Sequence, residues 1–377
     1  MESSPKLLYK TIEDKTIVWI ANKNEYVVVE NQTATILKKI ENGETIHKTS
    51  NEISAELNIP FEEVLPFVEK LTVDFLTIHK SKESDKIDSN IEIPKNFNFI
   101  KYYKINNLVF KVAFDDELEL SYVHPKFAHL VVENPSTIDF SFEVFLENSH
   151  IFLYVDGDFI GLWNKTEIHF FQGKFSMELI QKIHNKTEDE WLGVFHASAV
   201  SNGEKSILFL GDSGNGKSTS LSLLQANGFT CLADDFVPVD KNKQQIYSFP
   251  AAISIKKTSL SVLLSFYPEL QTSAEYHFTR LNKIVRYLKP NNTDFFSNLP
   301  CKELIFIKYE KDSGIICNKI SNLYAFEQLV PDSWLSPELE NAKIFLDWFS
   351  GLKCYQIKYS DNIKMIDTVS KIFENEF

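Results

Sequence analysis

The residues best suited to chemistry lie in the run GDSGNGKSTS, from Gly211 to Ser220. It contains the pattern G-x-x-x-x-G-K-S, whose glycines leave backbone N–H groups open to phosphate oxygens. In that pattern Lys217 places an ammonium group on the β- and γ-phosphates, and Ser218 offers a hydroxyl to Mg²⁺. The run therefore predicts a binding loop for a nucleoside triphosphate. The predicted nucleotide-binding residues are Gly211, Asp212, Ser213, Gly214, Asn215, Gly216, Lys217, Ser218 and Thr219.

The segments on either side of this run are those that such a loop requires. The apolar run SILFL (206–210) is typical of a buried strand. The following STSLSLLQAN (218–227) is predicted to be a helix, with buried leucines and with Gly228 as its end. A strand, a loop and a helix in that order bring the positive end of the helix dipole to a bound phosphate.

Two adjacent carboxylates follow the next predicted strand. The run FTCLA (229–233) precedes Asp234 and Asp235, and strand ends line the ligand crevice in α/β sheets. One carboxylate there can hold Mg²⁺, and the other can accept the proton of a hydroxyl that receives a phosphoryl group. The residues alone leave open which aspartate has which role. The alternative to a functional pair is an Asp-Asp turn that lies in solvent and has no role in binding or catalysis.

Three segments together resemble the kinase domain of HPr kinase/phosphorylase. They are HASAV (196–200), LFLGDSGNGKSTS (208–220) and GFTCLADDFVPV (228–239). That family has a histidine ahead of the loop, a GDSGxGKS loop and an ADD doublet after the next strand. The order and spacing match from Phe195 to Val239, and a weaker likeness extends toward residue 375.

This resemblance implies roles for the residues that it matches. Lys217 and Ser218 would bind ATP and Mg²⁺, and Asp234 would lie at the metal. Asp235 would be the general base, with the two aspartates still interchangeable, and His196 would assist near the acceptor. The resemblance also implies a homo-oligomer.

The chain departs from this family in two respects that concern charge. Thr219 stands where the family usually has a glutamate that helps with the metal, and the family's Gly-rich stretch with an arginine is absent. Phosphorolysis, and HPr as the substrate, are therefore not implied.

The chain contains few arginines. Lysine and arginine together number 39, and only Arg280 and Arg286 are arginines. Because arginine forms a bidentate fork for phosphate, Arg286 is the first candidate for a catalytic clamp on the phosphoryl group, followed by Arg280 and Lys256; two surface arginines are the alternative.

The N-terminal segment, residues 1–80, is predicted to be a winged-helix-like domain. TIVWIANKNEYVVVEN indicates two strands around a polar turn, and three short helices follow, the second with Thr49 and Glu52 as a capping box. The segment is similar to the PqqD-like fold, which binds leader peptides by adding them as an extra strand to a sheet edge. The likeness implies a leader bound by residues 15–80, and a structural or dimerising domain is the alternative.

The remainder of the chain divides by composition. Residues 81–90 are polar and charged and are predicted to be a linker. Residues 91–190 are predicted to be a β-rich α+β lobe, with a hairpin at Asp156-Gly157. Residues 191–377 are the predicted catalytic domain, which the resemblance makes a mixed-sheet P-loop domain of the HPr-kinase/PEP-carboxykinase type. Residues 91–190 and 191–377 could also form one continuous unit. The predicted fold class of the whole chain is α/β and α+β multidomain.

Composition limits the partners and the location. The net charge is −13, which opposes binding to nucleic acid and to anionic membranes. We find no signal peptide and no uncharged stretch of about 18 residues that could span a membrane. The four cysteines are scattered, without C-x-x-C, as expected for reduced thiols in a cytoplasmic protein.

The favoured function is an ATP-dependent kinase that phosphorylates a hydroxyl, serine in preference, on a ribosomally made precursor peptide held by the N-terminal domain. Two alternatives remain open at this point. One is a kinase for a small molecule or a carrier protein, and the other is an accessory P-loop ATPase or nucleotide-binding switch.

Overall fold

The computed structural model describes residues 6–77, 92–212, 214–278 and 283–376, so that the predicted linker at 81–90 lies outside the described residues. The chain forms two compact units. The smaller unit comprises Met1–Ile91, Ser321–Pro331 and Leu335–Gly351, and the larger unit comprises Glu92–Ile320, Asp332–Trp334 and Leu352–Phe377. The region predicted as a separate lobe thus belongs to the same unit as the glycine-rich run.

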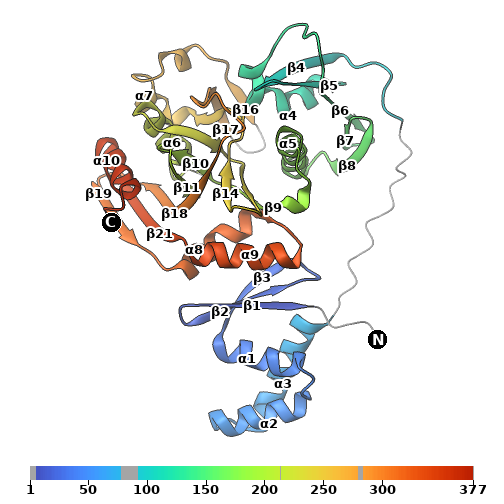
Figure 1. The fold of residues 1–377 in the computed structure, drawn as a ribbon, viewed down its shortest axis with the longest axis vertical. Coiled ribbons are helices and arrows are strands. Elements are labelled where there is room, and N and C mark those ends of the chain that lie inside the picture. The colour runs from blue at the N-terminus through green and yellow to red at the C-terminus, as the bar shows by residue number, and fades with distance from the viewer. Residues whose placement is uncertain (1–5, 78–91, 213, 279–282, 377) are drawn as a thin grey trace. The chain divides into compact units, whose positions relative to one another are not determined.

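The smaller unit contains an antiparallel sheet with the order β1-β2-β3 (Figure 1). Its strands are β1 (Leu7–Ile12), β2 (Lys15–Ile20) and β3 (Glu25–Glu30). Its helices are α1 (Asn31–Glu41), α2 (Ile46–Leu57), α3 (Phe61–Leu76), α8 (Asn322–Leu329) and α9 (Leu339–Ser350). Because strand side chains alternate between faces, Val18 and Ile20 join the core with α1–α3, whereas Tyr26 contacts Phe326 and Phe345 of α8 and α9.

The predicted capping box at the second helix of this unit is wrong. Helix α2 begins one turn earlier than expected, and the Thr45 hydroxyl accepts a hydrogen bond from the backbone N–H of Lys48 at 3.2 Å. Thr49 lies inside the helix and is buried. The sequence offers two threonines one turn apart, and the apolar side chain of Ile46 places the first of them at the start of the helix.

In the larger unit, one sheet has the order β4-β5-β6-β7-β8, and helices α4 and α5 pack against it (Figure 1). The strands are β4 (Phe99–Ile105), β5 (Leu108–Phe114), β6 (Phe140–Glu147), β7 (His150–Val155) and β8 (Asp158–Asn164). The helices are α4 (Glu117–Phe127) and α5 (Ile168–His184). The predicted hairpin is confirmed, since Asp156 and Gly157 join β7 to β8 with φ values of 53° and 88°, as a two-residue turn between twisted strands requires.

The second sheet of the larger unit is mixed and follows the order β12-β10-β11-β18-β14-β13-β9-β20, with β21 beside β18 and β19 beside β21. Its first strands are β9 (Trp191–Phe195), β10 (Ser198–Ser201), β11 (Ser206–Leu210), β12 (Thr230–Asp234), β13 (Val237–Asp240) and β14 (Gln245–Tyr247). The others are β18 (Asn298–Tyr309), β19 (Ile315–Lys319), β20 (Ser333–Leu335) and β21 (Lys353–Tyr359). Strands β11, β18 and β21 run parallel to one another, so they end at the same edge of the sheet.

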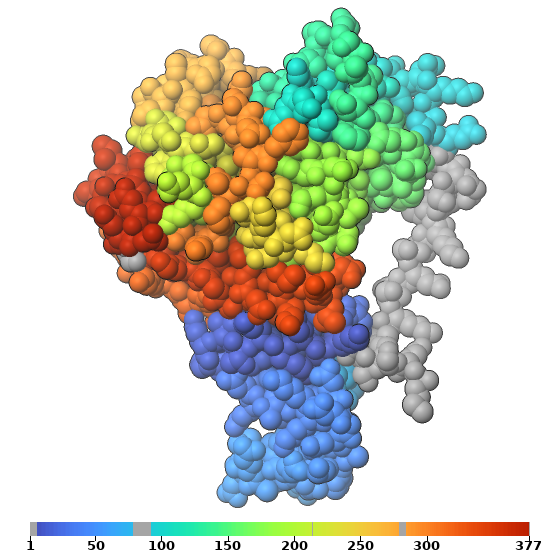
Figure 2. All heavy atoms as spheres, in the orientation of Figure 1, coloured from blue at the N-terminus to red at the C-terminus, as the bar shows by residue number. Residues whose placement is uncertain are grey.

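Two helices and a small third sheet complete the larger unit. Helices α6 (Lys217–Ala226) and α10 (Asn362–Phe373) share one apolar core with β11, β18 and β21, and Figure 2 shows the red α10 on the surface beside the yellow-green α6. The third sheet has the order β15-β17-β16. Its strands are β15 (Ile253–Lys256), β16 (Tyr276–Phe278) and β17 (Lys283–Leu288), with the short helix α7 (Leu260–Leu263) nearby.

The fold is therefore mixed α/β with several sheets, as the sequence predicts at this level. Within the described ranges, no helix is both long enough and apolar enough to cross a membrane.

Candidate active site

The predicted strand, loop and helix form a continuous unit. Strand β11 ends at Leu210, the glycine loop (residues 211–219) follows, and α6 begins at Lys217. Gly211 has a φ of 145°, and a Cβ there would lie 2.7 Å from the carbonyl oxygen of Ile307 in β18. No larger residue fits at this close approach, because the neighbouring atom belongs to the backbone of a buried strand.

Backbone and side-chain hydrogen bonds hold the glycine loop in shape. Within it, the N–H of Asn215 donates to the carbonyl oxygen of Asp212 at 3.1 Å. From β18, the N–H of Tyr309 donates to the carbonyl oxygen of Asn215 at 2.9 Å. Lys217 is only 7% exposed, and its ammonium group donates to the carbonyl oxygen of Gly211. A largely buried ammonium group at the N-terminus of a helix is an arrangement that a bound anion stabilises.

A cavity of about 590 Å³ opens at the glycine loop. Nine of the residues predicted from the sequence line it: His196, Asp212, Gly214, Gly216, Lys217, Ser218, Thr219, Asp235 and Lys256. The other lining residues are Ser254, Lys257, Thr258, Ser259 and Ile284. Residues from five separate segments of the chain thus meet at one cavity, and four of these segments contain residues predicted from the sequence.

Asp234 lies beneath the cavity and is 2% exposed. Its carboxylate accepts hydrogen bonds from the hydroxyls of Ser198 at 2.6 Å and Ser218 at 3.0 Å, and from the N–H of Ser254 at 3.1 Å. The pKa of Asp234 is raised to about 6, first by burial and then by the charge of Asp235, while the three hydrogen bonds act in the opposite direction. Among the described residues, none forms an ion pair with this carboxylate, so its charge lacks a partner there.

Asp235 follows the end of β12 and takes the left-handed conformation, with a φ of 64°. This conformation is uncommon for a residue other than glycine, although aspartate adopts it more readily than most. The turn of the chain separates the two carboxylates: Asp234 faces the protein interior, and the half-buried Asp235 lines the cavity. Of the two aspartates, Asp235 lines the cavity and Asp234 does not.

His196 is exposed and lies in the tight connection between β9 and β10. Strands β10 and β12 are antiparallel, and Ser198 pairs with Asp234. Continuing this register brings His196 to the end of β12, where it lines the same cavity as Asp235. The structure thus brings together the histidine and the aspartate doublet that the sequence singles out.

The structure does not place Arg286 among the residues that line the cavity, so its predicted catalytic role stays a prediction that this geometry does not support. The residue lies in β17 opposite Ile255, whose side chain belongs to the apolar core. Its guanidinium pairs with Glu275 at 3.0 Å, donates to the carbonyl oxygen of Leu270, and lowers the pKa of the Glu275 carboxyl. Lys256, at the end of β15, does line the cavity.

Two predicted residues, Ser213 and Arg280, lie outside the described part of the chain. Two others that hold Asp234 were missed: Ser198 through its hydroxyl, and Ser254 through its backbone N–H. Ser198 belongs to the segment HASAV (196–200) that the resemblance singles out, but no pattern in the sequence marks its hydroxyl as a partner of Asp234. A backbone N–H leaves no signal of residue type.

No protein-family model matches the chain, and no curated protein matches its sequence significantly.

Proposed function

We propose that the chain is an ATP-dependent kinase that transfers the γ-phosphoryl group to a hydroxyl. The observation that supports this most is the convergence of the glycine loop, an interior carboxylate and a cavity-facing carboxylate at one cavity. A phosphate-binding loop alone suits any nucleotide-binding protein. The position of Asp235 on the cavity that His196 and Lys256 also line is what favours transfer to an acceptor.

The residues at the loop fit a magnesium nucleotide. Mg²⁺ prefers oxygen ligands and usually takes one or two from the protein, with phosphate oxygens and waters completing the set. Ser218 and Asp234 supply these oxygens, and their side chains are already within 3.0 Å of each other. In the described ranges, no group of three or more His, Cys, Asp or Glu residues could hold a metal, and the proposed site requires none. When bound, Mg²⁺ neutralises charge on the phosphate oxygens.

The transfer step assigns one role to each cavity residue. As the acceptor oxygen forms its bond to the γ-phosphorus, its proton passes to the Asp235 carboxylate, and the bond from the γ-phosphorus to the bridging oxygen breaks, releasing ADP. Lys217 and Lys256 stabilise the negative charge on the transferring group and on the leaving phosphate. His196 contributes a polar contact on the acceptor side of the cavity.

We further propose that the acceptor is a serine hydroxyl of a precursor peptide, held through the smaller unit. Strand β3 is an edge strand, pairing with β2 and with no other strand in the described ranges. Alternate side chains of β3, Val27 and Val29, pack on the apolar core, which holds the strand in place and leaves its outer backbone groups available to an added strand. The PqqD-like resemblance of residues 15–80 supports the same role.

The proposal is tested by intact-mass spectrometry. The protein is incubated with Mg-ATP and the peptides encoded beside its gene, and we expect one peptide to gain a single phosphoryl mass. Lys217→Ala should abolish the gain. Asp235→Asn should slow it by about 10²–10⁴-fold, the usual contribution of a general base, while ATP remains bound. ATP hydrolysis without a mass gain on any peptide would refute the peptide acceptor, and full transfer by Asp235→Asn would refute the assigned base.

A further inference from the structure

The exposed ring of Tyr309 lies next to the glycine loop, on the side away from the aspartates. Tyr309 is the last residue of β18 and is 50% exposed. Its N–H bonds the loop at Asn215, and a Cβ on Gly216 would lie 3.5 Å from the Cβ of Tyr309. Tyr309 thus presents an exposed aromatic ring directly beside the loop that is proposed to hold a triphosphate.

The orientation of the Tyr309 ring is set by a second tyrosine. Tyr359, the last residue of β21, meets it edge to face, with ring centroids 5.6 Å apart and an interplanar angle of 82°. The Tyr359 hydroxyl in turn hydrogen-bonds the Ser220 hydroxyl in α6 at 2.8 Å. Tyr359 is buried and is anchored to the helix that begins at the loop. It therefore holds the Tyr309 ring on one side, while Tyr309 remains 50% exposed and can contact a ligand.

The strand order fixes which end of a bound triphosphate lies near this ring. Along the sheet edge, β12 and β10 carry Asp235 and His196 to one side of β11, and β18 and β21 lie on its other side. For transfer, the γ-phosphate must face Asp235. The nucleoside end of the same molecule then leaves the glycine loop on the opposite side, toward the ends of β18 and β21.

We propose that Tyr309 is the stacking platform for the nucleoside base of the bound triphosphate. This inference rests on the proposed function, because it takes the direction of the triphosphate from the position of Asp235. Bases stack on aromatic side chains with a contribution of about 1–3 kcal/mol, which corresponds to roughly a 5- to 150-fold change in affinity. Tyr309 is then a binding residue, and its loss raises Kd and KM for ATP without lowering kcat.

The test compares a ligand that has a base with one that lacks it. Isothermal titration calorimetry measures the Kd of Mg-ATP and of Mg-tripolyphosphate for the wild-type protein and for Tyr309→Ala. We expect Tyr309→Ala to weaken ATP binding about tenfold and to leave tripolyphosphate binding unchanged. Tyr309→Phe keeps the ring and should retain the ATP affinity. Tyr324→Ala, which removes an exposed tyrosine from the smaller unit, is the matched control and should change neither Kd.

The outcomes separate the two proposals. If the wild-type protein binds ATP and tripolyphosphate equally well, or if Tyr309→Ala weakens both alike, the stacking role is overturned and the nucleotide loop stands. If Tyr309→Ala leaves ATP binding unchanged, the stacking role is likewise overturned. If the wild-type protein binds neither ligand, the proposed function fails together with the inference.

Discussion

Two buried aspartates of the larger unit, Asp234 and Asp240, differ in the groups that hold their negative charge. Both stand at the ends of strands, and they are 2% and 1% exposed. Asp234 is held by two serine hydroxyls and one backbone N–H. Asp240 is held by three backbone N–H groups and a lysine.

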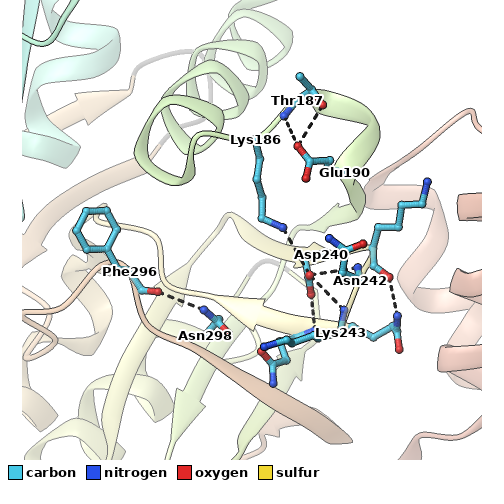
Figure 3. A network of polar contacts seen from close by, with 11 residues as sticks. Lys186, Thr187, Glu190, Asp240, Asn242, Lys243, Phe296 and Asn298 are labelled. Atoms are coloured by element: carbon cyan, nitrogen blue, oxygen red, sulfur yellow. Dashed lines mark hydrogen bonds and ion pairs between the residues drawn. The ribbon is translucent and has the colours of Figure 1, made fainter.

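The surroundings of Asp240 satisfy it completely, as Figure 3 shows for much of the network. The N–H groups of Asn242 and Lys243 donate to one carboxylate oxygen at 3.2 Å each, and that of Gln245 donates to the other at 2.9 Å. The Lys186 ammonium lies 3.6 Å away, over the rings of Trp191 and Tyr247. These contacts stabilise the turn between β13 and β14 and connect it to Lys186, just after α5. The role of Asp240 is therefore to stabilise the fold.

The comparison shows what distinguishes a carboxylate that stabilises a fold from one prepared for a ligand. Backbone N–H groups cannot rotate and can only donate, so they require a charged or carbonyl oxygen at Asp240. Serine hydroxyls rotate and can donate or accept, so under the proposed function they would tolerate a change at Asp234 from a hydrogen-bonded state to a metal-bound one. Burial and the charge of Asp235 raise the pKa of Asp234, and the proposed Mg²⁺ would balance the charge of this carboxylate.

The largest effect that follows from this comparison is on stability. Asp240→Asn should lower the free energy of unfolding by about 3–5 kcal/mol, because it leaves Lys186 as an uncompensated buried charge. The new amide N–H₂ would also face a backbone N–H, and no rotation of the partner relieves that contact. Urea unfolding monitored by circular dichroism measures the change. A loss of unfolding free energy below about 1 kcal/mol would show that the contacts of Asp240 do not stabilise the fold as proposed.

A smaller effect of opposite sign is expected at the other aspartate. Burial raises the folded-state pKa of Asp234 from 3.8 to about 6. Its contribution to stability is therefore fully present below pH 3.8 and is lost as the pH rises through about 6. Asp234→Asn removes this titration and should raise the free energy of unfolding at pH 7 by about 1–3 kcal/mol in metal-free buffer, and by little near pH 4.

The same unfolding experiment, repeated between about pH 4 and pH 7, checks this second prediction. The difference between wild type and Asp234→Asn should grow with pH. A difference that does not vary with pH would mean that the carboxylate is already compensated in the free protein, and the contrast with Asp240 would disappear.

The parts of the site that the sequence predicts are those whose chemistry is local. The glycine loop and the aspartate doublet each occupy a few consecutive residues, and a strand precedes each as expected. The supports of Asp234 come from further away, since Ser198 and Ser254 are 36 and 20 residues distant in the chain. Their partnership depends on how β10 and β15 lie beside β12, which no short pattern records.

The position of Arg286 depends on distant residues in the same way. Only the register with β15 decides which face of the sheet the arginine occupies. That register puts Arg286 opposite Ile255, on the face away from Ser254 and Lys256. In the same way, helices α8 and α9 were expected with the catalytic domain, and they pack instead on the N-terminal sheet through Tyr26.

The most direct test of the account is the magnesium dependence of ATP binding. Isothermal titration calorimetry would measure the Kd of ATP for wild type and Asp234→Asn, each with Mg²⁺ and with EDTA. If Ser218 and Asp234 hold the metal, Mg²⁺ tightens ATP binding to the wild-type protein, and this advantage is lost in Asp234→Asn, which keeps Lys217 for the phosphates. An equal magnesium advantage in both proteins, or no ATP binding at all, would contradict the proposed magnesium site.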